Sequence, residues 1–358
     1  MGHPVEFRDM HRYETLSSTA EEFMGGWLKA LTSGPDEETM KKLDGLLDTG
    51  VKLHTGGGLS GVHQFQGVPE VKKHLESERA RYGGGLTHTT RVLGANEDTD
   101  VVFLMIESKP SSMTDHTSPF IEVLKLDVML DDGTRKISSI TSRRHLSSSE
   151  LAKLAGGNPM GKVLTAPSPM RLVESRQETS NCDCCSEVAR ETLKGVTPEM
   201  IGEFAHAYCD ARTSASADRH ELAVHLDNAF EMYDPLGLVP LLKSSDEVND
   251  EAKAHAGIVG KDLLLERMGK MLKRYDVETC LRDTATSRDT NVGFVHWYAQ
   301  VTTKGPSLEI EGLPGVDEGD GQCFVVEGLD VVMFDKEGGV RAVWGFRDPM
   351  DWERDLMR

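Results

Sequence analysis

The feature that most constrains this chain is an internal repeat. Residues 47–55 align with 226–234 at a constant offset of 179, and 67–82 align with 260–275 at an offset of 193. Both copies of the longer segment begin with glycine and end with Arg-Tyr. The 358 residues are also enough for two domains. The repeat therefore predicts two similar units rather than one large core.

Each copy opens with a segment that predicts an amphipathic helix. In the first copy, Thr19 and Glu22 have the spacing of a capping box. Apolar residues then recur every four positions, at Phe23, Trp27 and Leu31. In the second copy, Thr197 precedes Pro198, the pattern of an N-cap followed by proline at the first helical position. One face of that helix carries Ile201, Phe204, Ala205 and Tyr208.

After the first helix, each copy predicts a second helix, a first strand and a third helix. Most of the remaining residues predict further strands. The alternating residues Val51/Leu53 and Phe230/Met232 have the period of a half-buried strand. The later strands are predicted at 86–94, 100–108, 119–130 and 135–145, and at 277–283, 292–302, 322–334 and 339–347. Helices followed by a run of strands predict an α+β fold, with helices packed on one face of a curved antiparallel sheet.

Turn-forming residues separate the two copies. Residues 147–196 contain runs of Ser, Gly and Pro and lack apolar periodicity, which is typical of a linker. We therefore predict a tail at 1–17, a first domain at 18–146, a linker at 147–196 and a second domain at 197–352. Two polar insertions, 235–256 and 304–321, enlarge the second copy.

Composition argues against several classes of protein. The formal net charge of −19 opposes contact with phosphate backbones, so we expect no nucleic-acid partner. No stretch approaches the roughly 20 apolar residues that span a bilayer. The N-terminus lacks the apolar run of a secretory signal, so we expect a cytoplasmic protein without a membrane partner. Three of the six cysteines, Cys182, Cys184 and Cys185, crowd together without a second ligand pair at zinc-site spacing. We therefore expect no metal and no cofactor.

The order of these elements resembles that of the NTF2-like superfamily, which includes SnoaL-like polyketide cyclases and ketosteroid isomerases. Residues 328–335 and 343–349 are similar to the last hairpin of that family. The resemblance covers 18–146 and 197–352. It implies two cystatin-like cones, each with helices packed on a curved sheet around a pocket for a small hydrophobic ligand. It also leaves open pairing of the two domains within the chain or a homodimer.

Within that family, the second copy is similar to ketosteroid isomerases at three positions. Tyr208 matches their oxyanion-hole tyrosine, Asp234 before Pro235 matches their general base, and Asp330 matches their protonated second oxyanion donor. Proton abstraction beside a carbonyl requires such a base and such donors. Alternation also places Asp330 on an apolar strand face, where an aspartate is costly unless it is paired or protonated. A role in a turn accounts equally well for the aspartate at Asp234. For Tyr208 the alternative is an ordinary tyrosine of the apolar core.

Further polar residues are candidates for the two pockets. In the second copy they are Tyr233 and His296. His296 reaches the pocket only if its row of the strand faces inward; a satisfied or exposed histidine is the alternative. In the first copy, Trp27 and Thr55 stand where the tyrosine and the base are expected. Its own candidates are His54, His88, Asp127, Asp115 and His116. The first copy is then either a degenerate structural partner or the site of a different activity, since SnoaL-like cyclases use an Asp/His pair.

These patterns favour one function and leave two alternatives. The leading hypothesis is a metal-independent isomerase, cyclase or dehydratase of small molecules, with acid–base chemistry in the second domain. The first alternative is a binding or scaffold protein that keeps the fold without the chemistry. The second rests on 143–148, Arg-Arg-His-Leu-Ser-Ser, which is similar to the His-Ser-Ser ending of iota-class carbonic anhydrases.

Overall fold

The chain divides into two compact units. The computed structural model describes residues 6–32, 36–56, 62–82, 86–110, 120–131, 134–145, 196–215, 219–233, 258–304, 321 and 323–348. The first unit ends at 145, and the second is described from 196 onward. The predicted linker, the two predicted insertions and the cysteine cluster lie almost entirely outside the described residues.

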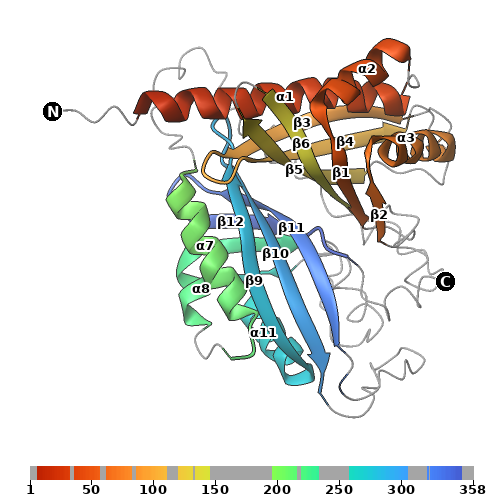
Figure 1. The fold of residues 1–358 in the computed structure, drawn as a ribbon. Coiled ribbons are helices and arrows are strands. Elements are labelled where there is room, and N and C mark those ends of the chain that lie inside the picture. Colours follow the sequence, from red (N-terminus) through yellow and green to blue (C-terminus); the bar gives the residue numbers. More distant parts are fainter. Residues whose placement is uncertain are drawn as a thin grey trace. The chain divides into compact units, whose positions relative to one another are not determined.

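The described part of the first unit contains three helices and six strands (Figure 1). The helices are α1 (Glu6–Thr32), α2 (Glu37–Leu46) and α3 (Val68–Tyr82). The strands are β1 (Leu47–Gly56), β2 (His63–Gln66), β3 (Leu86–Asn96), β4 (Val101–Pro110), β5 (Phe120–Asp131) and β6 (Thr134–Arg144). Hydrogen bonding orders them β2-β1-β6-β5-β4-β3.

The described part of the second unit has the same inventory. Its helices are α7 (Pro198–Ala211), α8 (His220–His225) and α11 (Lys261–Arg274). Its strands are β7 (Leu226–Tyr233), β8 (Ile258–Val259), β9 (Tyr275–Thr286), β10 (Val292–Thr303), β11 (Cys323–Phe334) and β12 (Val340–Trp344). Their order is β8-β7-β12-β11-β10-β9.

The two units therefore share one topology. Element order and strand order correspond one to one, as the internal repeat predicts. One detail corrects the expectation of a purely antiparallel sheet. In each unit the first strand pairs with the last one in parallel, β1 with β6 and β7 with β12. A parallel pair needs a long connection, and the helix and hairpins between these strands supply it.

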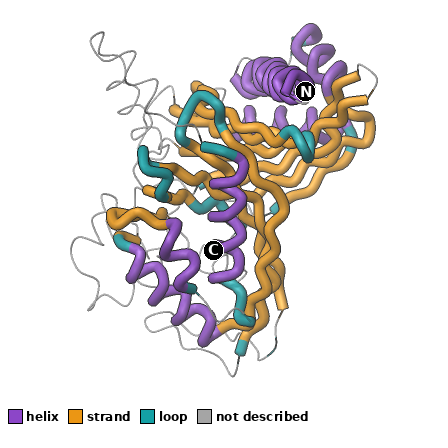
Figure 2. Tube along the Cα trace, turned by 90° about the vertical axis from the view of Figure 1, so that its left-hand side faces the viewer, coloured by secondary structure: helices purple, strands orange, loops and turns teal. Residues whose placement is uncertain are grey.

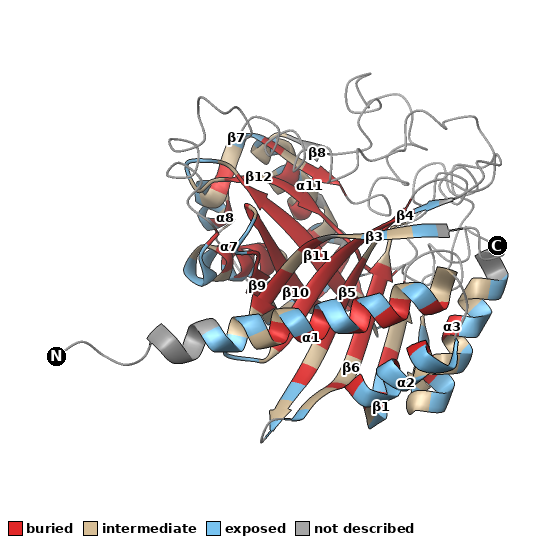
Figure 3. Cartoon of the chain, turned by 90° about the horizontal axis from the view of Figure 1, so that it is seen from above, coloured by how far each residue is buried: buried red, intermediate tan, exposed pale blue. Residues whose placement is uncertain are grey.

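Helices cover one face of each sheet (Figure 2), so the predicted α+β class is confirmed. In the first unit α1 contacts β3 and β4, while α2 contacts β1 and β6. In the second unit α7 contacts β9 and β10, while α11 contacts β7 and β9. We call this side the helix-covered face. Each unit has its own apolar core there, and buried residues dominate β10 and β11 (Figure 3).

The first helix begins earlier than predicted. α1 starts at Glu6, so 6–17 is helical rather than part of a tail, and Thr19 lies inside the helix rather than at its cap. Thr19 is fully buried, and its hydroxyl donates to the carbonyl of Thr15 at 2.7 Å. A threonine can satisfy its hydroxyl in this way within a helix. The apolar stripe starts at Leu16, upstream of the apparent capping box, and its burial outweighs the local capping signal.

The first helix of the second unit begins where the sequence predicts. Thr197 is the N-cap of α7, and its side chain accepts a hydrogen bond from the backbone N–H of Met200 at 3.2 Å. Pro198 occupies the first turn, where its missing N–H costs nothing. The four residues of the predicted apolar face, Ile201, Phe204, Ala205 and Tyr208, are all buried.

Candidate functional site

Two of the three principal candidates lie on the helix-covered face of the second unit. Tyr208 is in the last turn of α7 and Asp330 is in β11, and each is only 1% exposed. Val326 and Val332 share a row with Asp330 and belong to the core under α7. The predicted strand phase of Asp330 is therefore correct. The third candidate, Asp234, follows β7 and lies outside the described residues.

Trp297 packs directly against Asp330. Its indole N–H donates to Asp330 Oδ2 at 2.9 Å. Gly328 lies opposite Trp297 in the ladder and makes room for the ring, since a Cβ there would lie 2.3 Å from the indole Cζ2. The guanidinium of Arg212 lies 3.8 Å from the Trp297 ring centroid and 5.0 Å from that of Tyr208. The indole of Trp297 thus already occupies one oxygen of the Asp330 carboxylate.

Cys209 lies beside this group but is poorly suited to nucleophilic chemistry. Burial raises the pKa of its thiol to about 12, and the negative charge of Asp330 acts in the same direction against the positive charge of Arg212. The thiolate is the reactive form of cysteine. A buried thiol with so high a pKa behaves as a small apolar side chain.

His296 lies on the opposite face of the second sheet. Its Nε2 is 2.8 Å from Glu327 Oε1, and its Nδ1 is 3.4 Å from Asp283 Oδ2. The side chain is 3% exposed. His296 is therefore a satisfied histidine, the alternative that the sequence left open, and it does not face the pocket candidates.

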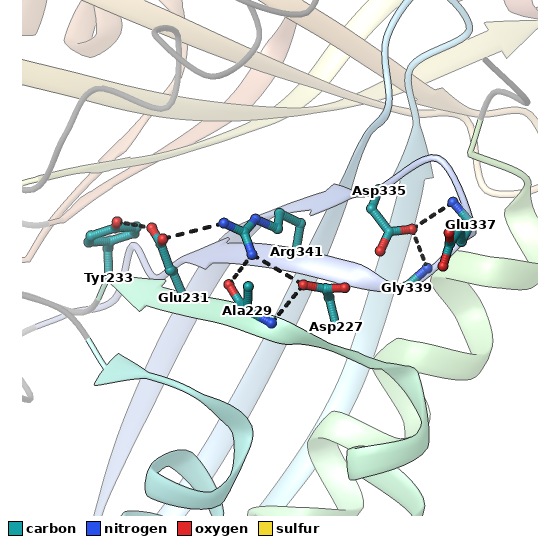
Figure 4. A network of polar contacts seen from close by, with 8 residues as sticks. All are labelled: Asp227, Ala229, Glu231, Tyr233, Asp335, Glu337, Gly339 and Arg341. Atoms are coloured by element: carbon teal, nitrogen blue, oxygen red, sulfur yellow. Dashed lines mark hydrogen bonds and ion pairs between the residues drawn. The ribbon is translucent and has the colours of Figure 1, made fainter. Parts of the chain in front are cut away.

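Tyr233 also lies away from the helix-covered face. Its ring stacks on Trp344 with centroids 5.4 Å apart, and its hydroxyl donates to Glu231 (Figure 4). Burial raises the pKa of Tyr233, and the hydrogen bond to Glu231 adds to this effect. Arg341 on β12 links Glu231 to Asp227. This network links β7 to β12. Tyr233 therefore does not line the pocket that the sequence predicts.

Two candidates of the first unit are also displaced from the helix-covered face. Asp127 forms an ion pair with Lys125 at 2.8 Å, and neither belongs to the core under the helices. In β5 the buried Leu126 and Val128 belong to that core, so Asp127 between them points to the other face. His54 alternates with the buried Leu53 and so points to the other face. Asp115 and His116 lie outside the described residues.

His88 does lie on the helix-covered face of the first unit. It stands opposite Ser108 in the β3–β4 ladder, and its Nδ1 is 2.7 Å from the Ser108 hydroxyl oxygen. Burial lowers the pKa of His88. Its Nε2 is buried and has no hydrogen-bond partner among the described residues. This imidazole is therefore held mainly neutral, with one ring nitrogen open to a ligand.

A carboxyl group missed by the sequence analysis lies on the same face. Glu122 on β5 accepts a hydrogen bond from the Ser142 hydroxyl on β6. Burial raises the pKa of Glu122, and the charge of Glu78 on α3 raises it further. The hydrogen bond from Ser142 and the charge of Arg144 act in the opposite direction. A carboxyl group whose pKa is shifted by burial and by identified neighbouring groups is a candidate acid–base group.

Strand register brings these groups to one end of the sheet. Thr55 pairs with Ser142, and Ser108 pairs with His88. Glu122 pairs with Ile106 across β4 and β5, two register positions from the pair of Ser108 with Phe120. We call Thr55, Ser142, Glu122, Ser108 and His88 the polar row. It crosses five neighbouring strands, and Arg144 stands opposite Glu122 at the same end of the face.

Sequence reasoning found His88 but missed the rest of the polar row. Glu122 sits two residues before Leu124 in an alternating apolar strand, the same signal that singled out Asp330. No family motif marks Glu122, in contrast to Asp330. The pairing of Glu122 with Ser142 depends on register between strands, which alternation within one strand does not specify.

Other features of the described residues are weaker candidates. An open hollow of about 520 Å³ borders β1 and α3, but Lys72 there pairs with Asp44 at 2.6 Å and Lys136 donates to the Gly45 carbonyl. Within the described ranges, no group of three or more His, Cys, Asp or Glu is arranged to hold a metal ion. None of the described helices is long and apolar enough to cross a membrane.

In each unit helices cover one face of the sheet, which is the α+β arrangement that the sequence predicts. No protein-family model and no curated protein matches the sequence. Solved structures do match, each over less than half of this chain.

Three of these structures illustrate the similarity. An NTF2-like protein of unknown function from Exiguobacterium sp. 255-15 shares 11% identity, with 41% of this chain and 99% of that one covered and a TM-score of 0.28. A putative polyketide cyclase from Xanthomonas campestris pv. campestris shares 13%, with 44% and 97% covered and a TM-score of 0.31. A SnoaL-like protein of unknown function from Burkholderia thailandensis E264 shares 13%, with 43% and 98% covered and a TM-score of 0.28. Such identities bear on fold alone.

Proposed function

We propose that this chain is a small-molecule enzyme of the isomerase, cyclase or lyase kind, and that its proton-transfer group is Glu122 in the first unit. One observation carries the proposal. Glu122 is a carboxyl group whose pKa is raised by burial and whose orientation is held by Ser142. A general base or acid works best when its pKa lies near the working pH, and burial is the usual means of raising that of a carboxyl group.

The residues of the polar row suit the following proton transfer. The ionised Glu122 accepts a proton from a carbon next to a carbonyl group, and the electron pair of the broken C–H bond moves onto the carbonyl oxygen. His88 is the donor on the far side of the row for that oxygen: when Ser108 donates to its Nδ1, the N–H of the neutral imidazole is on Nε2. Strands lie ~4.8 Å apart, so β5 and β3 leave roughly 10 Å between them. Glu122 then returns the proton to the substrate at the same or a neighbouring atom.

The site expected from the family resemblance, Tyr208 with Asp234 and Asp330, is the competing location for this chemistry. We favour the first unit because Trp297 already donates to Asp330 and the aromatic rings around Arg212 are packed together. The second unit therefore suits a binding or supporting role within the same chain.

The test is exchange of carbon-bound hydrogen in deuterated buffer. The full-length protein is incubated with a panel of small cyclic and linear ketones and followed by proton NMR. Glu122→Gln removes the base and should lower the catalysed exchange by about 10²–10⁴-fold. Glu76→Gln is the matched control, because Glu76 is exposed on α3 and should leave exchange unchanged.

Asp330→Asn distinguishes the two units. The proposal expects exchange to persist in this variant. Loss of exchange in Asp330→Asn with full exchange in Glu122→Gln would move the chemistry to the second unit. No exchange by the wild-type protein with any carbonyl compound of the panel would favour the binding or scaffold alternative.

A further inference from the structure

Arg212 in the second unit is a cation without a carboxylate partner among the described residues. It caps the C-terminal end of α7, and its side chain is only partly buried. Its side-chain contacts are the rings of Trp297, 3.8 Å from the guanidinium carbon, and Tyr208, 5.0 Å away. The Nη1 atom is buried and makes no hydrogen bond within the described part of the chain.

Arg267 also has a buried Nη1 without an acceptor among the described residues, but Arg212 lies against two aromatic rings. Acidic residues outnumber Lys and Arg by 59 to 40, so partners for a guanidinium are plentiful. Arg341, Arg12 and Lys72 each pair with a carboxylate. Leaving a buried donor without an acceptor is destabilising, and more so for a charged group. Such a cost is consistent with a guanidinium whose missing acceptor is supplied by a bound ligand.

The geometry defines how a ligand would approach. Aromatic rings lie against the guanidinium, and Nη1 at its edge has no acceptor among the described residues. A planar guanidinium presents paired donors along that edge, which matches the two oxygens of a carboxylate. The hydroxyl of Thr279, also buried and without a partner among the described residues, adds a second polar atom. Thr279 is held close because its backbone N–H donates to Thr213, the residue after Arg212, at 3.0 Å.

We propose that Arg212 and Thr279 form a binding site for a small organic carboxylate on the helix-covered face of the second unit. The carboxylate pairs with the edge of the guanidinium and accepts from the Thr279 hydroxyl. The apolar body of the ligand lies against the core, where Leu281 flanks Thr279 on the same row of β9. This site is separate from the polar row and does not rest on the chemistry proposed for Glu122.

Binding of benzoate to the full-length protein tests the proposal, with benzamide as the uncharged probe of the same shape. Isothermal titration calorimetry should detect saturable binding of benzoate and at least tenfold weaker binding of benzamide. Arg212→Met should weaken benzoate binding at least tenfold. Arg282→Met is the matched control. Arg282 also stacks on a tyrosine, Tyr298, at 4.9 Å, but it is exposed and belongs to the same strand as Thr279.

Thr279→Val provides a second variant in case Arg212→Met fails to fold, as judged by circular dichroism. It removes one hydroxyl at nearly constant shape and should weaken benzoate binding several-fold without affecting benzamide. The proposal is overturned if benzoate does not bind the wild-type protein. It is also overturned if benzamide binds equally well, or if Arg282→Met weakens benzoate binding as much as Arg212→Met.

Discussion

At the scale of single residues, Glu122 links function to stability. Because its pKa is raised in the folded state, the neutral form is favoured there. Its contribution to stability is then full below the unfolded pKa of ~4.3 and is lost as the pH rises through the folded pKa. At neutral pH the negative charge of Glu122 therefore lowers the free energy of unfolding. A residue that lowers stability at its working pH is typical of an active site.

The substitution Glu122→Gln should separate these two effects. Glutamine carries no charge at any pH and keeps an oxygen that can accept from Ser142. We expect the free energy of unfolding of the variant to exceed that of the wild type at pH 7, and the difference to shrink towards pH 4. Urea unfolding between pH 4 and pH 8 measures it. The exposed Glu76→Gln should give no such pH-dependent difference, and a constant difference for Glu122→Gln would contradict the assignment.

At the scale of elements, packing between β10 and β11 depends on the absence of one side chain. Gly328 lies under the indole of Trp297, and an added Cβ would lie 2.3–2.7 Å from three ring atoms. The ring cannot move easily because Asp330 and Arg212 hold it. Gly328→Ala should therefore cost about 1–3 kcal/mol in the free energy of unfolding, as other overpacked cores do.

A glycine in α7 provides the control for that substitution. A Cβ on Gly202 would meet nothing within 4 Å, and alanine is favoured over glycine inside a helix by roughly 0.5–1 kcal/mol. Gly202→Ala should be neutral or stabilising in the same urea titration. If Gly328→Ala is also neutral, the indole is less firmly held between Asp330 and Arg212 than this packing implies.

At the scale of the whole molecule, the duplication predicts two separable bodies. Each unit has its own core and the same order of helices and strands. Turn formers between them predict that residues 155–195 are cut first in limited proteolysis. Mass spectrometry should then find two protected fragments, one containing 6–145 and the other 196–348. Early cleavage within β4 or β10, with 155–195 intact, would contradict this organisation.

Local patterns were sufficient for the helices and the longer strands of this fold, but not for the short strands β2 and β8. Strand ranges, the Thr197 cap and the repeat itself depend on alternation and turn chemistry, which act over a few residues of the chain. The start of α1 was wrong because a capping box is only a local preference. Burial of a longer apolar stripe through Leu16 overrode it.

The sequence by itself thus determined the fold class, the duplication and the face on which Asp330 lies. Only the tertiary structure decided what surrounds each polar group. Whether Glu122 meets Ser142, or Trp297 meets Asp330, depends on register between strands that are distant in the chain. A shift of one residue in register reverses every side chain of a strand, so the composition of a site on a sheet is a property of pairing rather than of any single segment.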